Sequence, residues 1–430
     1  MSKNILLFGA GKSATCLINY LLQECSDHNW HLTVADSNLQ LAQSKIGDVS
    51  RASAIGIQVE NEEQRASVIK ECDIVISLLP PFLHILVAVD CLKFGKDLLT
   101  ASYVDENISA LKEDVKKKGL LFLCETGLDP GIDHMSAMQL IHRIEASGGI
   151  ITSFKSHCGG LVAPESDDNP WHYKISWNPR NVVNAGNGGA VFKEKDIVCH
   201  TKYEELFRCR EVMVTGLGKL AYYPNRDSLH YSVLYGLDKA HTFMRTTLRY
   251  PEFCRSWKSI VSAGLTNGKT PVNQPGLTIK KWAENISPFV NADNKEQLFF
   301  LGLFDDTPVP AEAKTSADIL QYLLETKLVM RPSDRDMIVM LHELDYELNG
   351  KKMKTESCLI VKGEDSTLTA MAKTVGLPLG ITASYILQEK ILLTGIQIPT
   401  IPEIYEPVMR QLNSHGIIFD DRNFQNADQF

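Results

Sequence analysis

The first residues of the chain whose types and spacing could do chemistry are Gly9 and Gly11, followed by Ala14 in a G-x-G-x-x-A pattern. An apolar run, 4–8, precedes them, and an apolar helical pattern, 16–22, follows. A strand, a glycine turn and a helix in this order leave backbone N–H groups at a helix N-terminus, where a pyrophosphate can bind. In such a turn Gly9 permits the tight bend, Gly11 lets the backbone approach the phosphates, and Ala14 lets helix and strand pack closely. The pattern predicts a dinucleotide site.

Asp36 ends the next apolar run, about 20 residues beyond the glycine turn. A carboxylate at this place accepts hydrogen bonds from both hydroxyls of the adenine ribose and repels a 2′-phosphate. We therefore expect NAD as the cofactor, with NADP as the less favoured alternative. Lys12 and Ser13, which lie inside the glycine pattern, are assigned to the same cofactor site.

Alternating apolar strands and helical segments over residues 1–128 predict an α/β Rossmann domain, a doubly wound parallel sheet with helices on both faces. Ligands of such sheets collect at the carboxyl ends of the strands. Segments 77–80, 100–103 and 125–129 should therefore meet in one crevice. Asp129 is the carboxylate expected there as a general acid or base. The alternative is that it caps a helix beginning near Pro130.

The rest of the chain predicts a mixed α+β substrate and dimerisation domain, 129–235 plus 332–393, with a hairpin turn at Asn349-Gly350. Residues 236–331 read as a helical insertion, and a helix is expected over 239–247. The C-terminal helices, about 394–430, are expected to pack back on the Rossmann domain.

Composition excludes several classes of protein. The net charge of −8 disfavours a nucleic-acid partner, and no uncharged apolar run approaches the ~20 residues of a membrane span. The ten cysteines are scattered without a C-x-x-C pair, and the histidines show no ligand spacing, so we expect reduced thiols and no metal. Because the chain enters a strand almost at once, no signal peptide is expected, and we predict a cytoplasmic protein.

Later blocks are more specific than the glycine turn, among them Cys158-Gly159-Gly160-Leu161, Tyr223-Pro224-Asn225-Arg226-Asp227-Ser228 and Thr247-Leu248-Arg249-Tyr250. With segments 9–14, 77–80, 100–104, 125–135, 163–165, 169–170, 174–177 and 179–180, they make the chain resemble the L-glutamate-forming saccharopine dehydrogenases, or saccharopine reductases, over nearly its whole length.

The resemblance implies an enzyme acting on saccharopine, in which the ε-nitrogen of lysine is bonded to the α-carbon of glutamate. Oxidation at the lysine-side carbon gives an imine, and water splits it into glutamate and 2-aminoadipate 6-semialdehyde. The resemblance also implies a homodimer that binds small-molecule substrates: saccharopine, or glutamate and 2-aminoadipate 6-semialdehyde. The alternatives are an oxidoreductase acting on another secondary amine, of the polyamine type, and a cofactor-binding relative without turnover.

Saccharopine carries three carboxylates, which guanidinium groups bind with two parallel hydrogen bonds. The resemblance implies substrate contacts at Ser102, Tyr103, Arg226, Thr247, Leu248 and Arg249. The predicted crevice and the resemblance together assign cofactor contacts to Ser77, Leu78, Leu79, Ala101, Ser102, Leu128, Asp129, Pro130 and Trp177.

For some of these residues the sequence allows a second role. Asp129 and Tyr103 are the expected proton-transfer residues, and Glu125 and His134 are second-rank candidates. Trp177 is equally well read as a core tryptophan, and an ion pair with Asp227 is the alternative for Arg226. Lys174 and Arg180 are expected either to add charge to the substrate pocket or to lie on the surface.

Overall fold

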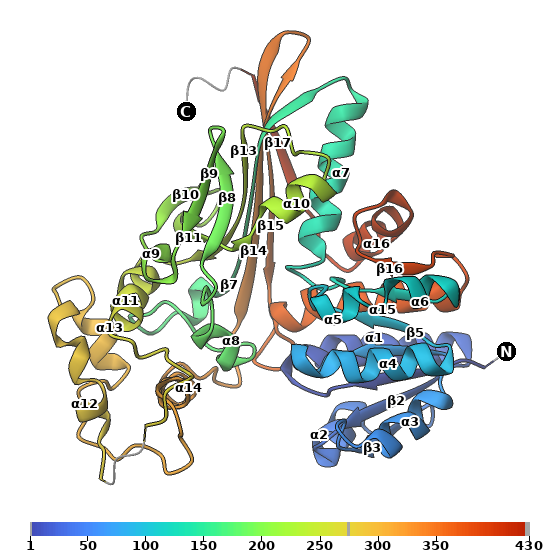
Figure 1. The fold of residues 1–430 in the computed structure, drawn as a ribbon, viewed down its shortest axis with the longest axis horizontal. Helices are drawn as coiled ribbons and strands as arrows, with labels where there is room; N and C mark the ends of the chain where they lie inside the picture. Colours follow the sequence, from blue (N-terminus) through green and yellow to red (C-terminus); the bar gives the residue numbers. More distant parts are fainter. Residues whose placement is uncertain (1, 273–275, 426–430) are drawn as a thin grey trace. The chain divides into compact units, whose positions relative to one another are not determined.

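The computed structural model describes residues 2–272 and 276–425, which divide into two compact units (Figure 1). The first unit comprises residues 2–142 and Thr367–Ile418, and the second comprises Arg143–Ser366 and residues 419–425. The three-domain division expected from the sequence stays a prediction.

The first unit contains a seven-stranded sheet in which all neighbouring strands are parallel. In spatial order the strands are β16 (Gly395–Gln397), β6 (Leu121–Leu123), β5 (Asp97–Thr100), β4 (Ile74–Ser77), β1 (Asn4–Phe8), β2 (His31–Asp36) and β3 (Ala52–Gly56). Six of them follow the order 3-2-1-4-5-6 of Rossmann folds. Leu7 and Ile76 are fully buried, as expected for strands covered on both faces. The predicted fold class is confirmed.

Helices cover this sheet (Figure 1). They are α1 (Thr15–His28), α2 (Leu39–Ile46), α3 (Glu62–Lys70), α4 (His84–Phe94), α5 (Glu106–Ser109), α6 (Lys112–Lys117), α15 (Ala370–Leu387), α16 (Pro402–Ser414) and the first part of α7 (Ile132–Ala146). Short 3₁₀ turns, η1 (Lys12–Ala14) and η2 (Pro81–Leu83), precede α1 and α4.

Helix α15 packs directly on α1, and glycine makes the close approach possible. A Cβ atom on Gly376 would lie 2.7 Å from the backbone nitrogen of Leu17. Among the described residues α15 is long and apolar enough to cross a membrane, but 72% of its apolar window is buried inside the protein. Its apolar character is therefore explained by its place in the core.

The second unit contains a ten-stranded mixed sheet. Its main path runs β10 (Arg210–Val214), β11 (Gly218–Pro224), β13 (Thr242–Arg249), β7 (Ile150–Val162), β14 (Asp336–Leu348), β15 (Lys351–Lys362) and β17 (Asp420–Gln425). Off this path lie β8 (Ala190–Glu194), β9 (Ile197–Thr201) and β12 (Arg226–Asp227). The hairpin predicted at Asn349-Gly350 is confirmed, because Leu348 pairs with Lys351 and both turn residues have positive φ.

The helix expected over 239–247 is wrong. Residues 242–247 belong to β13, a strand that lies between β11 and β7. Phe243, Met244 and Thr246 are all almost fully buried. A strand buried on both faces loses the polar–apolar alternation that distinguishes it from a helix, which explains the error.

Most of the remaining helices of this unit surround an aromatic core built on Trp171, Phe253 and Trp257. They are α8 (Pro179–Val183), α9 (Tyr203–Leu206), α11 (Pro251–Ser262), α12 (Ile279–Trp282), α13 (Lys295–Phe300) and α14 (Ser316–Lys327), with the 3₁₀ turn η4 (Glu284–Phe289). Helix α10 (Leu229–Leu234) contacts β8 and β13 instead, and a short turn, η3 (Pro164–Ser166), follows β7.

Candidate active site

The glycine turn after β1 has the shape of a phosphate cradle. Gly9 has φ +99°, and a Cβ atom there would lie 2.9 Å from the carbonyl oxygen of Leu78, so only glycine fits. At Gly11 a Cβ atom would meet no atom within 4 Å, so the space in front of this residue is open. Ala14 is buried where η1 leads into α1. The turn fits a dinucleotide pyrophosphate, because the space in front of Gly11 is open and a side chain there would fill it.

Asp36 ends β2 beside this turn, and its carboxylate is engaged by the protein itself. The N–H of Ala10 donates to Oδ2 at 2.7 Å, and the N–H of Asn38 donates to Oδ1 at 2.8 Å. Asp36 thus ties the glycine turn to the end of β2. This structural role accounts for an acid at this position without ribose recognition.

The three loop segments expected to meet do lie together at the carboxyl ends of β4, β5 and β6. The N–H of Glu125 donates to the Ser102 carbonyl at 3.0 Å, and the N–H of Thr126 donates to the Thr100 carbonyl at 3.1 Å. A Cβ atom on Gly127 would approach the Cβ of Ala101 to 2.8 Å, so these two loops are tightly packed.

Tyr103 and Asp129, the expected proton-transfer residues, are hydrogen-bonded. The Tyr103 hydroxyl donates to Asp129 Oδ1 at 3.2 Å, and both residues are half-buried. Helix α7 begins at Ile132, so Asp129 lies three residues ahead of it, in a turn that the Gly127 N–H closes on the Pro130 carbonyl. An N-cap residue directly precedes its helix, so Asp129 is too far from Ile132 to be the N-cap of α7. Its carboxylate lies beside Tyr103.

Glu125 and His134, the second-rank candidates, form a buried pair behind Tyr103. Glu125 Oε2 lies 2.8 Å from His134 Nε2, and Glu125 Oε1 accepts the Val104 N–H at 3.1 Å. Glu125 has φ +56°, a left-handed conformation that costs a non-glycine residue of order 1–3 kcal/mol. The pair therefore holds the Tyr103–Val104 loop in place.

His84 was not predicted as a site residue. It begins α4, and its ring bridges two predicted site residues: Nδ1 lies 2.8 Å from Ser77 Oγ, and Nε2 lies 2.8 Å from Ser102 Oγ. No sequence spacing signals this contact, because it depends on how α4 returns over β4 and β5.

In the second unit Arg249 ends β13 and is 4% exposed. Its Nη1 donates to the Leu248 carbonyl at 2.8 Å, and its guanidinium carbon lies 5.3 Å from the ring centroid of Tyr173 and 5.4 Å from that of Phe253. Burial opposes its charge, but the neighbouring Tyr223 and Tyr173 raise the pKa of Arg249, so it stays a cation. Nε is buried without a hydrogen-bond partner, and no carboxylate of the described residues pairs with the guanidinium.

Trp177 lies beside the aromatic neighbour of Arg249. Its Nε1 donates to the Tyr173 hydroxyl at 3.0 Å, and the half-buried indole packs against the aromatic core. Tyr173 was missed from sequence and links Trp177 to Arg249. The assignment of Trp177 to the cofactor stays a prediction.

The other predicted substrate contacts of this unit differ in exposure. Thr247 is half-buried, whereas the Leu248 side chain is fully buried among the apolar residues of the sheet, so only the backbone of Leu248 is a candidate for a ligand contact. Arg226 is exposed and has φ +51°, a strained conformation of the kind found at functional sites. Asp227, its suggested ion-pair partner, accepts the N–H of Leu229 at 2.8 Å.

Lys174 and Arg180 are both neutralised by carboxylates. Lys174 is buried and lies 2.8 Å from Asp168 and 2.7 Å from Asp334, while Arg180 pairs with Asp318. Neither residue offers an unpaired charge to a substrate. The surface alternative is also wrong for Lys174, whose buried ammonium links two loops.

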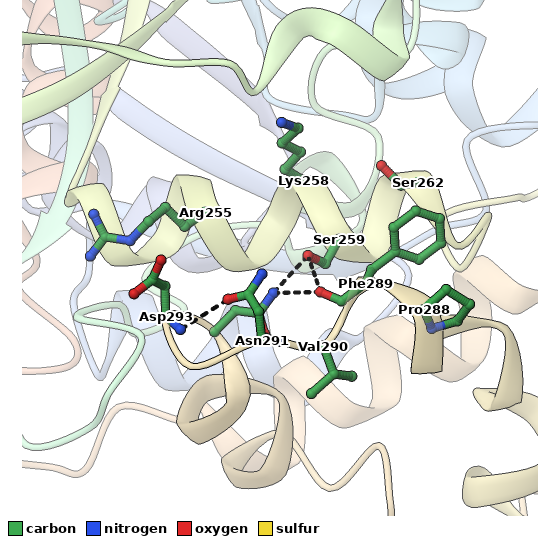
Figure 2. Close-up of a pocket in the computed structure, with 10 residues that line it drawn as sticks. Arg255, Lys258, Ser259, Ser262, Pro288, Phe289, Val290, Asn291 and Asp293 are labelled. Atoms are coloured by element: carbon green, nitrogen blue, oxygen red, sulfur yellow. Dashed lines mark hydrogen bonds between the residues drawn. The ribbon is translucent and has the colours of Figure 1, made fainter.

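A pocket of about 370 Å³ is lined by α11, the end of η4 and the segment after it. Figure 2 shows its lining residues. Two of its polar side chains are hydrogen-bonded: Asn294 donates to Ser259 Oγ at 2.9 Å, and Ser259 donates to the Phe289 carbonyl at 3.3 Å. It contains none of the predicted site residues. Across residues 2–272 and 276–425, no group of three or more His, Cys, Asp and Glu is placed to hold a metal ion.

Two family models match the chain. The saccharopine dehydrogenase NADP binding domain matches residues 5–123, and the saccharopine dehydrogenase C-terminal domain matches residues 127–417. A Rossmann unit with a cradle for a dinucleotide, joined to a mixed-sheet unit with a buried arginine, fits an oxidoreductase of this kind. The chain belongs to the saccharopine dehydrogenase family, and the predicted resemblance is confirmed.

Individual relatives support the family assignment. The chain is 30% identical to saccharopine dehydrogenase [NADP(+), L-glutamate-forming] of Saccharomyces cerevisiae, over 98% of this chain and 99% of that protein. The solved apo structure of histidine-tagged saccharopine dehydrogenase (L-Glu forming) from the same yeast superposes with a TM-score of 0.86, at 29% identity, covering 98% of this chain and 100% of that one.

Longer proteins match as well. The mitochondrial alpha-aminoadipic semialdehyde synthase of Bos taurus is 33% identical over 97% of this chain, which covers 47% of that protein. The chain thus spans about half the length of the first curated relatives it matches. The homospermidine synthase of Legionella pneumophila superposes with a TM-score of 0.60 at 11% identity over 99% of this chain and 92% of that one, which shows a shared fold alone.

The prediction of NAD as cofactor is wrong. The model matching residues 5–123 is described as an NADP binding domain, and the fungal relatives are named as NADP(+) enzymes. The inference failed because it explained an acid at position 36 by ribose recognition alone, whereas the Asp36 carboxylate also accepts two backbone N–H groups and so has a structural role.

Proposed function

We propose that the chain oxidises saccharopine with NADP to L-glutamate and 2-aminoadipate 6-semialdehyde. The yeast relatives carry this activity in their names, and the chain covers them almost completely. The enzyme would act on a CH–NH bond. It would remove a proton from the secondary amine and a hydride from the lysine-side carbon. Water then adds to the imine carbon, and the carbon–nitrogen bond breaks to release glutamate and the aldehyde.

The observation that carries the proposal is the buried, unpaired guanidinium of Arg249. Its cation–π contacts with Tyr173 and Phe253 contribute about 0.5–2 kcal/mol. Burying a charge costs several kcal/mol, and no carboxylate of the described residues pairs with this one. A carboxylate supplied by the substrate would complete the pairing, and saccharopine carries three. Arg226 is the second candidate for such a contact.

Asp129 and Tyr103 are the residues proposed to move the proton. The Tyr103 hydroxyl donates to Asp129 Oδ1, which places the two groups within reach of one another. A carboxylate can take the proton of the secondary amine and later return it as imine hydrolysis proceeds. Glu125 and His134 keep the Tyr103 loop in position for this exchange.

The cofactor fits the first unit. Backbone N–H groups of the glycine turn would hold the pyrophosphate, and the exposed Ser37, which directly follows β2, is a candidate for the adenosine 2′-phosphate. When bound, the nicotinamide supplies the acceptor for the electron pair that leaves the substrate carbon. A homodimer in the cytoplasm is proposed as well, and light scattering on a size-exclusion column tests the dimer.

The test of the proposed function is turnover of saccharopine by the purified chain. With NADP, we expect one glutamate to form for each nicotinamide reduced. The reduced nicotinamide is measured by its absorbance, and glutamate by amino-acid analysis. The absence of turnover with either NADP or NAD would reject the proposal. Turnover of a polyamine substrate without carboxylates would instead support the alternative oxidoreductase.

A further inference from the structure

We propose that His84 is a positioning residue that sets the direction of the Ser102 hydroxyl, so that Ser102 donates a hydrogen bond to an oxygen of a bound ligand. The inference rests on the proposed function only in assigning Ser102 to the ligand site. The ligand oxygen belongs either to a substrate carboxylate or to the carboxamide of the cofactor, and the test below distinguishes the two.

The His84 ring joins two serines from different strand ends. Its Nδ1 lies 2.8 Å from Ser77 Oγ, and its Nε2 lies 2.8 Å from Ser102 Oγ. Burial lowers the pKa of His84 to about 4, with only partial opposition from Asp105, so the ring is neutral near pH 7. A neutral imidazole has one N–H donor and one acceptor nitrogen, so it must donate to one serine and accept from the other.

Ser77 decides which way the ring is protonated. Its side chain is fully buried in β4, and within the described part of the chain its hydroxyl hydrogen-bonds to His84 Nδ1 alone. If Nδ1 carried the proton, the Ser77 O–H would be buried without an acceptor, at a cost of about 1–3 kcal/mol. Ser77 therefore donates to Nδ1, and the proton resides on Nε2.

The Nε2–H group then points at Ser102. Thr100 Oγ1 lies 3.4 Å from Nε2, much farther than the 2.8 Å of Ser102 Oγ, and it accepts the Ser102 N–H at 3.2 Å. The Ser102 carbonyl accepts the Glu125 N–H. With its backbone groups engaged and its Oγ accepting from His84, half-buried Ser102 keeps its hydroxyl proton for an outside acceptor.

The first arm of the test reads the tautomer directly. We expect ¹⁵N chemical shifts of the His84 ring in the ligand-free wild type to show protonated Nε2 and unprotonated Nδ1. Protonated Nδ1 would overturn the proposal. This measurement needs no substrate, so it stands whether or not saccharopine is turned over.

The second arm compares His84→Gln with His84→Asn. The amide nitrogen of glutamine can replace Nε2–H, whereas the shorter asparagine cannot reach Ser102. We expect H84N to weaken ligand binding about tenfold and H84Q to restore most of it. A rise in the saccharopine KM assigns the Ser102 acceptor to the substrate, and a rise in the NADP Kd, measured by fluorescence, assigns it to the cofactor.

The background of Ser102→Ala separates positioning from general damage. If His84 acts through Ser102, H84N has no further effect on KM or Kd in the S102A protein. Equal losses in both backgrounds would contradict the proposal, as would equal losses for H84Q and H84N. Unchanged thermal unfolding of H84Q shows that the comparison is made on folded protein.

Discussion

At the scale of the residue, several polar side chains of the candidate site have specific partners. Asp36 is occupied by backbone N–H groups, Lys174 by two carboxylates, and Asp129 is hydrogen-bonded to Tyr103. The sequence predicted which residue types gather at the site, since they follow strand ends. It could not predict that Asp36 serves the fold, because such a contact depends on the path of the glycine turn.

Replacing Asp36 tests this structural role. Asp36→Ala removes the acceptor of two N–H groups, and hydrogen bonds to charged groups contribute about 1.5–3 kcal/mol each. We expect a lower thermal unfolding midpoint and faster hydrogen exchange at the Ala10 amide. Ser37→Ala is the matched control and should leave both unchanged. Unaltered exchange at Ala10 in the Asp36 variant would show that the carboxylate is dispensable to the turn.

Replacing Asp129 and Tyr103 tests proton transfer. A positioned general base contributes typically 10²–10⁴-fold, so we expect Asp129→Asn to lower kcat about 100-fold or more with little change in NADP binding. Tyr103→Phe should lower kcat less, because the carboxylate remains. Steady-state kinetics across pH measures both, with Glu113→Gln on the exposed surface of α6 as control. A kcat of Asp129→Asn close to that of the wild type would exclude Asp129 as the base.

At the scale of the element, the glycine turn and the strands of the first unit were predictable because their pattern is local. The strand β13 was not: residues 242–249 lie buried between two strands and lack the alternation of a half-exposed strand. The error concerned the element and not the site residues, since Thr247 and Arg249, which β13 carries, were already assigned as substrate contacts. The contacts of His84 and Tyr173 were also beyond prediction, because they depend on how the chain folds back between different elements.

Two alanine substitutions separate the roles of the glycines. Gly9→Ala should lower both stability and NADP affinity, because its Cβ would meet the Leu78 carbonyl at positive φ. Gly11→Ala meets no protein atom within 4 Å, so it should leave stability unchanged while weakening NADP binding. Thermal unfolding and fluorescence titration measure the two effects. Full NADP affinity in Gly11→Ala would mean that the pyrophosphate lies elsewhere.

The central strands of the second unit carry an acid-sensitive contact. Burial would raise the pKa of Glu343, but His157 at 3.0 Å and Lys354 at 2.9 Å hold it well below its usual range. Stability from this group is fully present above the unfolded pKa of about 4.3 and is lost as the pH falls further toward the folded value.

The matching prediction concerns Glu343→Gln. Relative to the wild type, this variant should lose less of its unfolding temperature between about pH 6 and pH 3, because it has no carboxylate to protonate. Glu347→Gln, exposed on the same strand, should follow the wild type. Parallel curves for the wild type and Glu343→Gln would show that the contact contributes nothing to acid sensitivity.

At the scale of the whole molecule, the proposed chemistry draws on residues of both compact units. The phosphate cradle, Tyr103 and Asp129 belong to the first unit, and Arg249 belongs to the second. Family membership, which rests on matches across nearly the entire chain, is what relates these residues to one reaction. The central claim is that the Arg249 cation is completed by a carboxylate of the substrate.

The most direct test is a double-mutant cycle between Arg249 and the substrate. Binding of saccharopine and of three analogues, each lacking one carboxylate, is measured for the wild type and for Arg249→Gln, with exposed Arg210→Gln as control. We expect that one analogue binds the wild type about tenfold or more weakly than saccharopine does. For Arg249→Gln, the same analogue and saccharopine should bind with almost equal affinity. Independent, additive losses for all three analogues would contradict this expectation.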